Sequence, residues 1–177
     1  MQQCTSNDDL IEYQEFNWSV MSFVSEMVGL FRDNPDPQTA ILQILKRVGE
    51  LYRVDRVYIS LFTPDGTKIE TALQWHVEDT PALNFSDLIN RKDVLHTFQE
   101  REICRCDDVS KLDDENAKKF YDTYGVKAGI EYLFIKNGEA FGWIGLHDCH
   151  HTRHWLAREI ELLQTVAILL RERIHSL

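Results

Sequence analysis

An Asn-Gly pair between two apolar segments constrains the fold of this chain more than any other sequence feature. Residues 127–136 and 140–147 are rich in β-branched and aromatic residues, and Asn137–Gly138 lies between them. Asn-Gly between such segments is the strongest short-range signal for a β-hairpin, so the two segments are predicted to pair antiparallel. Ile130–Ile135 is apolar at nearly every position, which is typical of a strand covered on both faces.

A second hairpin and several helices are predicted from the remaining periodicity. Strands are expected at Arg56–Phe62 and Lys68–His76, and a short one at Glu102–Cys106. Helices are expected at Leu10–Phe31, Pro37–Tyr52 (with Asp36 as N-cap), near Asp93–Phe98, at Asp113–Tyr124 and at Leu156–His175. Because both hairpins require antiparallel pairing, the fold class is α+β. Long helices are expected on one face of the sheet, and shorter helices and loops on the other.

Composition limits the partners and the compartment. The chain has 29 acidic and 19 basic residues and a net charge of −10. This balance argues against binding to nucleic acid or to an anionic membrane surface. Four cysteines do not suggest a disulfide framework. No signal segment stands out, and no apolar run approaches the ~20 residues of a membrane helix, so a cytoplasmic protein is expected.

Several segments follow one another in an order typical of one family. Tyr124–Lys136 contains Gly-Val-Lys at residues 125–127, and Asn137–His147 contains a Gly-x-x-Gly strand. Arg153–Leu163 leads into the last helix with Arg-x-aromatic. Upstream, Ile41–Thr63 fits a second helix with a first strand, and Ile103–Val109 fits a strand that ends in Asp-Val. With these segments the chain resembles, over residues 36–175, a GAF domain, a sensory or dimerisation module of bacterial signalling proteins.

The resemblance implies a profilin/PAS-like architecture. It has a central antiparallel sheet of about six strands, N- and C-terminal helices on one face, and short helices and loops that form a pocket on the other. Residues 1–34 would form an N-terminal dimerisation or signalling helix, and residues 35–177 the GAF-like domain with its long C-terminal helix. Two residues depart from the family pattern. Ala128 replaces a frequent Ser, and Leu156 replaces a Ser/Thr helix cap, so another residue such as Thr152 must cap the last helix.

The resemblance also places the pocket between the sheet and residues 77–125. Its candidate lining is Trp75, Phe85, Leu95, Phe98, Cys104, Cys106, Tyr121, Tyr124, Glu131 and Tyr132. Glu131 interrupts an apolar strand, so it is either a buried carboxylate with a partner or an edge residue in water. Core packing is the alternative role of the aromatic residues. An aromatic cavity with few polar groups would suit a planar or apolar small molecule, and no specific cofactor is implied.

The last predicted helix has a spacing that favours a homodimer. Ile160, Leu163, Ala167, Leu170, Ile174 and Leu177 follow each other at intervals of 3, 4, 3, 4 and 3 residues, as in a heptad seam. Leu162, Val166 and Leu169 form a second stripe, so one stripe would cover the sheet and the other would face a partner. The predicted interface is Ile160, Leu163, Ala167, Leu170 and Ile174 with Val20, Phe23 and Met27 of the first helix. The alternative is a single buried helix in a monomer.

Three further motifs contain residue types that can carry chemistry. The string HDCHHTRH at His147–His154 contains zinc-ligand residue types. Adjacent His residues rarely reach one metal, however, so a polar surface loop without metal is expected. Cys104 and Cys106 would share one strand face, as a redox pair or as inert buried thiols. GAF-like domains that attach bilins carry a Cys–His pair. His96 has no adjacent Cys, so covalent bilin attachment is not expected.

The resemblance implies a sensory domain, and the lack of a phosphate loop or nucleophile elbow in the sequence favours a non-enzymatic one. It would bind a small molecule and signal through a helical homodimer to an output domain, such as a diguanylate cyclase or histidine kinase, into which the last helix continues. One alternative is a purely structural dimerisation module whose pocket is filled by its own side chains. The other is a small thiol redox enzyme that uses Cys104 and Cys106.

Overall fold

The computed structural model describes residues 7–84, 91–99 and 101–174, and all of the predicted helices and strands are present. The elements are α1 (Asn7–Asp33), α2 (Pro37–Tyr52), β1 (Arg56–Phe62), β2 (Ile69–His76), α3 (Arg91–Phe98), β3 (Ile103–Cys106), a 3-10 turn (Val109–Lys111), α4 (Glu115–Thr123), β4 (Ala128–Lys136), β5 (Glu139–Asp148) and α5 (Ala157–Ile174). Asp36 caps α2 by accepting a hydrogen bond from the backbone N–H of Thr39 at 3.0 Å, as predicted.

The strands form one antiparallel sheet in the order β2-β1-β5-β4-β3. Both predicted hairpins are confirmed, and Asn137 and Gly138 make the β4–β5 turn with φ values of 53° and 82°. About six strands were expected, whereas the described residues contain five. Residues 77–84, between β2 and α3, form no strand, and residues 85–90 lie outside the described part of the chain.

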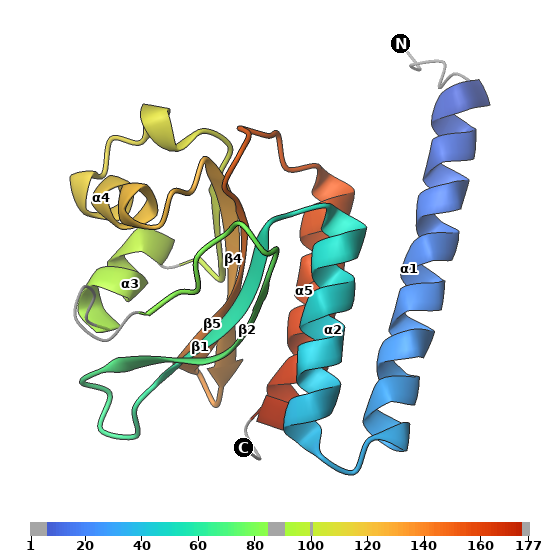
Figure 1. The fold of residues 1–177 in the computed structure, drawn as a ribbon, viewed down its shortest axis with the longest axis horizontal. Helices are drawn as coiled ribbons and strands as arrows, with labels where there is room; N and C mark the ends of the chain where they lie inside the picture. Colours follow the sequence, from blue (N-terminus) through green and yellow to red (C-terminus); the bar gives the residue numbers. More distant parts are fainter. Residues whose placement is uncertain (1–6, 85–90, 100, 175–177) are drawn as a thin grey trace.

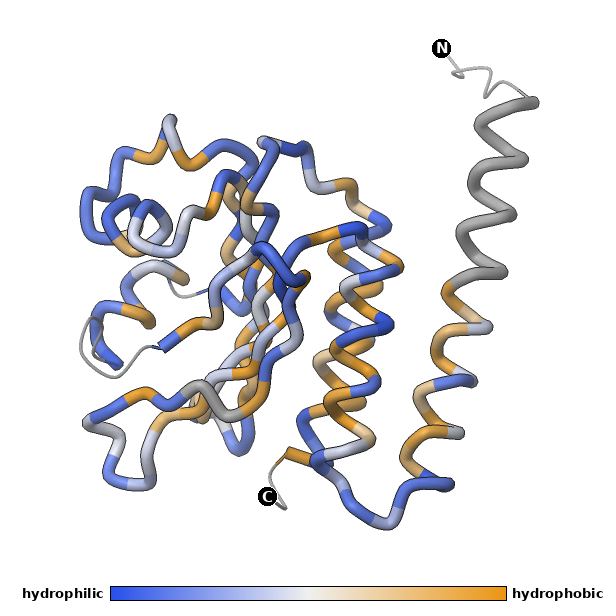
Figure 2. The backbone as a smooth tube through the Cα atoms, viewed as in Figure 1, coloured by the Kyte–Doolittle hydropathy of each residue, from blue (hydrophilic) through white to orange (hydrophobic). Residues whose placement is uncertain are grey.

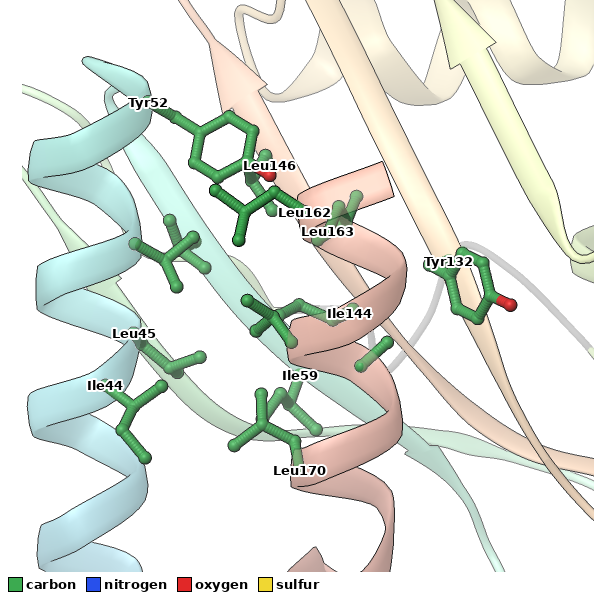
Figure 3. Close-up of a cluster of buried hydrophobic side chains, with 14 of the residues drawn as sticks. Ile44, Leu45, Tyr52, Ile59, Tyr132, Ile144, Leu146, Leu162, Leu163 and Leu170 are labelled. Carbon is green, nitrogen blue, oxygen red and sulfur yellow. The ribbon is translucent and has the colours of Figure 1, made fainter. Parts of the chain in front are cut away.

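Helices cover both faces of the sheet, as the α+β prediction required. Figure 1 shows α2 and α5 side by side on one face, and α3 and α4 on the other. The main core lies between the sheet and the α2–α5 pair, where Ile44, Leu45, Ile59, Ile144 and Leu163 are fully buried (Figure 3). Strands β1 and β4 are buried on both faces over most of their length.

Helix α1 packs against the outer side of α2 as a third layer (Figure 1). Phe23 and Met27 are buried there, and Arg47 of α2 binds the carboxylate of Glu26 at 2.7 Å. Apolar positions along the α2 and α5 layer continue onto the C-terminal half of α1 (Figure 2). On that half, Met21 and Val28 remain 67% and 53% exposed.

The predicted dimer seam belongs to the core of a single chain. Leu163, Ala167, Leu170 and Ile174 are 0–2% exposed, and they pack in the cluster that includes Phe23 and Met27. Ile160 and Val20 are half-buried against the same cluster. Leu162 and Val166 are also buried, because α5 contacts both β4 and α2 and so needs a wide apolar face. Both stripes of α5 therefore face inward, and neither presents a seam to a partner.

The cap of α5 comes from Glu159 and not from Thr152. The backbone N–H of Leu156 donates to the Glu159 carboxylate at 2.9 Å, which is the reciprocal half of a capping box. Arg153 holds the same carboxylate at 2.6 Å, and its guanidinium lies 4.2 Å from the ring centroid of Trp155. A side chain inside the helix thus compensates for the missing Ser/Thr cap.

Replacing Gly49 with Ala is expected to destabilise the domain, because a Cβ atom at this position would overlap the ring of Trp75, which lies across α2. Overpacking of this kind costs about 1–3 kcal/mol. Gly29→Ala in α1 is the matched control, since a Cβ atom there meets nothing within 4 Å. The control should gain up to about 1 kcal/mol from helix propensity. Urea unfolding of both variants measures the two effects, and equal free energies of unfolding would contradict this packing.

Candidate functional site

A cavity of about 180 Å³ lies between the sheet and the helices α3 and α4. Its floor is formed by Tyr58 of β1, Cys104 of β3, Glu131 of β4 and Trp143 of β5. The remaining lining comes from Asp93, Val94, His96, Thr97 and Phe98 on α3, and from Asp114, Asn116, Ala117, Lys119, Phe120, Tyr121 and Thr123 at α4. Helices α3 and α4, whose residues line the cavity, lie on the face of the sheet opposite α2 and α5 (Figure 1).

Glu131 is the buried carboxyl group at the floor of this cavity, with only 5% of its surface exposed. The Tyr121 hydroxyl lies 2.8 and 2.9 Å from its two carboxyl oxygens, and Tyr58 also hydrogen-bonds to it. Of the two alternatives for Glu131, the structure therefore supports a buried carboxyl group with partners.

His147 reaches the same carboxyl group, and Arg56 holds the imidazole from the other side. Arg56 is fully buried, and its Nη1 lies 3.1 Å from Nδ1 of His147. A guanidinium only donates, so Nδ1 must be the acceptor and the imidazole proton must sit on Nε2. Nε2 then donates to Oε1 of Glu131 at 3.3 Å. Burial and the charge of Arg56 hold the pKa of His147 well below its usual value, so the imidazole is neutral.

The position of Tyr58 depends on a glycine in the neighbouring strand. Tyr58 is paired with Gly145 across β1 and β5, and a Cβ atom at Gly145 would overlap the Tyr58 ring. The ring therefore lies across β5, where Nε1 of Trp143 donates to the Tyr58 hydroxyl at 3.2 Å. A directed chain runs from Trp143 through Tyr58 to Glu131.

Burial raises the pKa of Glu131 from 4.5 to about 8, although the hydrogen bonds from Tyr121 and Tyr58 oppose this shift. Near neutral pH the carboxyl group is therefore mostly protonated. Its neighbours are nevertheless arranged as donors, so they would stabilise the ionised form if an additional positive charge entered the cavity.

The structure brings together only part of the predicted lining. Phe98, Cys104, Tyr121 and Glu131 line the cavity. Leu95 and Tyr124 pack in the apolar clusters beside it, and Tyr124 donates its hydroxyl hydrogen to the backbone oxygen of Asn84. Cys106 is buried in the cluster next to Tyr121. Phe85 lies outside the described residues.

Two predicted lining residues lie on the opposite face of the sheet. Trp75 packs against α2 at Gly49. Tyr132 faces the α5 side (Figure 3), where its hydroxyl donates to Glu102 at 2.6 Å. Neighbouring residues of a strand point to opposite faces, so Tyr132 cannot share the cavity with Glu131. Both residues are part of the helical-layer core instead.

The sequence reasoning missed several residues of the site. Tyr58, Phe120 and Trp143 line the cavity and Arg56 supports His147, but none of the four is among the predicted lining residues. His147 was assigned to a polar surface loop, but it is fully buried at the end of β5. The loop interpretation fits His150 and His154, which are exposed and bind Asp55 and Asp107 at 2.9 and 2.6 Å. Within the described residues, no group of three or more His, Cys, Asp and Glu side chains is arranged to hold a metal ion.

The two strand cysteines are poorly suited to thiolate chemistry. Burial raises the pKa of Cys104 far above its usual range and that of Cys106 to about 11. Since the thiolate is the reactive form, this environment favours inert thiols over the redox alternative.

The fold is an α+β domain with a helical layer on one face of the sheet and a cavity on the other. A model of the GAF domain family matches residues 36–174. The chain therefore belongs to the GAF domain family.

Solved GAF domains share this fold at low sequence identity. One is the phycocyanobilin-bound GAF domain of a cyanobacterial phytochrome, with 18% identity over 88% of this chain and 93% of that chain and a TM-score of 0.74. Another is the blue-light-absorbing form of the Thermosynechococcus elongatus PixJ GAF domain, with 22% identity, coverage of 82% and 89%, and a TM-score of 0.62. A third is the chromophore-binding domain of the bacteriophytochrome RpBphP3 from R. palustris, with 14% identity, coverage of 93% and 61%, and a TM-score of 0.72.

A search of curated proteins gave no match to this chain. Among the described residues, no helix combines the length and apolar character that crossing a membrane requires.

The buried carboxyl group predicts a pH-dependent stability that Glu131→Gln removes. Folded Glu131 keeps its proton up to about pH 8, whereas the unfolded chain loses it near 4.5. The free energy of unfolding therefore falls as pH rises through this window. The depressed pKa of His147 makes the free energy of unfolding rise with pH instead. That contribution is confined to pH values below the unfolded pKa of 6.5. Between pH 6.5 and 8 the Glu131 contribution should fall by about 2 kcal/mol.

The measurement is urea unfolding at pH 6.5 and pH 8, expressed as wild type minus variant. Taking this difference cancels the titration of exposed His150, whose pKa Asp55 raises. Glu139→Gln, on the exposed first residue of β5, is the control and should keep the wild-type slope. Parallel slopes for wild type and Glu131→Gln would contradict a protonated Glu131.

Proposed function

We propose that this chain is a sensory GAF domain that binds a small molecule in the cavity between the sheet and α3 and α4. The observation that carries this proposal is the cavity itself, which combines aromatic walls with the buried polar group of Glu131. A core built only for packing would have little reason to bury a carboxyl group, an imidazole and a guanidinium together. A site with a few fixed polar groups among aromatic side chains is what small-molecule recognition needs.

The ligand we propose is much smaller than a bilin. The solved structures include GAF domains with bound phycocyanobilin and biliverdin. The cavity here, at about 180 Å³, falls below the about 300–1,000 Å³ of pockets for drug-sized ligands. It is closer to the about 150 Å³ of a cavity that holds benzene. His96 lies on the lining, but its neighbours are Leu95 and Thr97, so no adjacent thiol is present for covalent attachment.

Strand β4 provides the route from the cavity to the helical layer. Glu131 faces the cavity, whereas Ile130 and Tyr132 pack in the core beneath α2 and α5. Arg171 of α5 also donates to the backbone oxygen of Ile135 in β4 at 3.1 Å. Because one strand contacts both regions, a shift of Glu131 on ligand binding would move the surface on which α5 rests. The signal would be the change between two arrangements of the contact between β4 and α5, one without ligand and one with ligand.

Blocking the cavity should abolish ligand binding without unfolding the domain. Ala117→Phe places a ring in the lining, whereas Ala157→Phe adds the same ring at the exposed first residue of α5. We expect single-ring molecules in a ligand-observed NMR screen to bind wild type and Ala157→Phe, and to lose at least tenfold in affinity for Ala117→Phe. Equal binding to all three proteins, or no binding to wild type, would contradict the cavity as the sensory site and favour the structural-module alternative.

We further propose that the helical layer forms a homodimer in a bacterial cytoplasmic signalling protein, with an output domain such as a diguanylate cyclase or histidine kinase. The support is the apolar surface left on the outer helices, since Met21 and Val28 of α1 and Ile168 of α5 are 67%, 53% and 45% exposed. Exposed large apolar side chains are typical of an interaction surface when they form a patch. A self-complementary contact between two copies is the commonest way to cover it.

Introducing negative charges on the exposed apolar surface of α1 should dissociate the proposed dimer. Met21→Glu with Val28→Glu would bury like charges in the interface, and light scattering after gel filtration should change from a dimer to a monomer mass. Ala82→Glu adds a charge at an exposed residue beyond β2 and should leave the dimer intact. A monomeric wild type at high concentration, or a dimer that survives both substitutions, would contradict this interface.

A further inference from the structure

We propose that the ligand is a small organic cation with one aromatic ring, such as an amine or amidine, whose charged nitrogen donates to the carboxylate of Glu131. This inference rests on the proposed function, because it takes the cavity as the sensory site and assigns the chemical class of its occupant. Its support comes from the hydrogen-bond capacity of Glu131, the charge of the lining and the aromatic walls.

Glu131 has room for one more donor. A carboxylate offers about four acceptor positions. The protein supplies Tyr121, Tyr58 and His147, and the single hydroxyl hydrogen of Tyr121 occupies only one position although it lies near both oxygens. At least one lone pair thus remains on a carboxyl group that lines the cavity. A ligand N–H fits this vacant position, whereas an ionised ligand carboxylate has no hydrogen to donate to it.

The charges around the cavity also favour a cation. In the described part of the chain, the cavity lining contains three acidic residues (Asp93, Asp114 and Glu131) but one lysine, Lys119. Asp114 is tied to the start of α4 by two backbone N–H groups, which keeps this carboxylate beside the cavity. The chain as a whole carries a net charge of −10, so its field attracts cations and repels anions.

The walls fit a flat ring beside that charge. Tyr58, Phe120 and Trp143 contribute aromatic surfaces to the lining, and the faces of such rings attract cations. The volume of about 180 Å³ limits the occupant to about one ring with a short polar arm, by comparison with cavities that hold benzene.

Binding of such a cation would be coupled to release of a proton. In the unliganded domain, burial keeps Glu131 mostly protonated near neutral pH. When the ligand enters, the O–H bond of the carboxylic acid breaks, the proton leaves to solvent, and the carboxylate pairs with the ligand cation. Affinity should therefore rise with pH up to about 8, where Glu131 is already half ionised.

Three single-ring probes test the proposal: benzylamine as the cation, benzyl alcohol as its neutral isostere and benzoate as an anion. Titration of the whole chain by ligand-observed NMR should show benzylamine binding at least tenfold tighter than benzyl alcohol, and benzoate weakest. The affinity for benzylamine should increase by about fiftyfold from pH 6 to pH 8, in proportion to the ionised fraction of Glu131. Glu131→Gln should remove both the preference and the pH dependence, whereas Glu139→Gln, on the exposed start of β5, should keep them.

The outcomes separate this inference from the function on which it rests. Benzyl alcohol binding as tightly as benzylamine, in a manner that Ala117→Phe abolishes, would overturn the cation class and leave the sensory cavity standing. Tight binding of benzoate would do the same. Absence of binding by all three probes would overturn the inference and count against the cavity as well. If Glu131→Gln does not fold, the comparison of probes and pH values on wild type still decides the question.

Discussion

The burial of one carboxyl group, that of Glu131, explains most of what is unusual in this domain. A carboxyl group in the interior must be neutral or surrounded by donors, and this structure provides for both. His147 and Tyr121 donate to it directly, and Arg56 fixes the imidazole tautomer from behind. The glycine at position 145 follows from the same requirement, because Tyr58 must lie across β5 to reach the site. Residues from two other strands, β1 and β5, and from helix α4 are thus tied to one side chain.

This arrangement also explains how one sheet lines a cavity on one face and supports a helical layer on the other. Successive residues of β4 point alternately to the cavity and to the helical layer, so Glu131 and Tyr132 belong to different environments although they are adjacent. The cavity side is small, polar at its floor and covered by short helices. The other side is a dry, close-packed core under α2 and α5, in which displacements are transmitted and not absorbed.

The sequence predicted the elements well because their signals are local. The Asn137–Gly138 turn, the Asp36 cap and the change of period after α2 each depend on a few neighbouring residues. The site was predicted less well because it depends on which strands pair and on which residues lie opposite each other in those pairs. Arg56 meets His147 only because β1 pairs with β5, and no sequence pattern fixes that pairing. Glu131 was recognised as an anomaly in an apolar strand, but its partners come from three other elements. The 3–4 spacing of α5 describes a core face and a dimer seam equally well, so burial alone could distinguish them.

The most direct test of this account is the titration of the Glu131 carboxyl group itself, followed by the ¹³C chemical shift of its side-chain carboxyl carbon. A midpoint near pH 8 is expected in the unliganded domain, because a buried acid of this kind is neutral at physiological pH. A midpoint near the ordinary value of 4.5 would mean that Glu131 is ionised or solvated in the folded protein. That result would contradict the central role given to its burial.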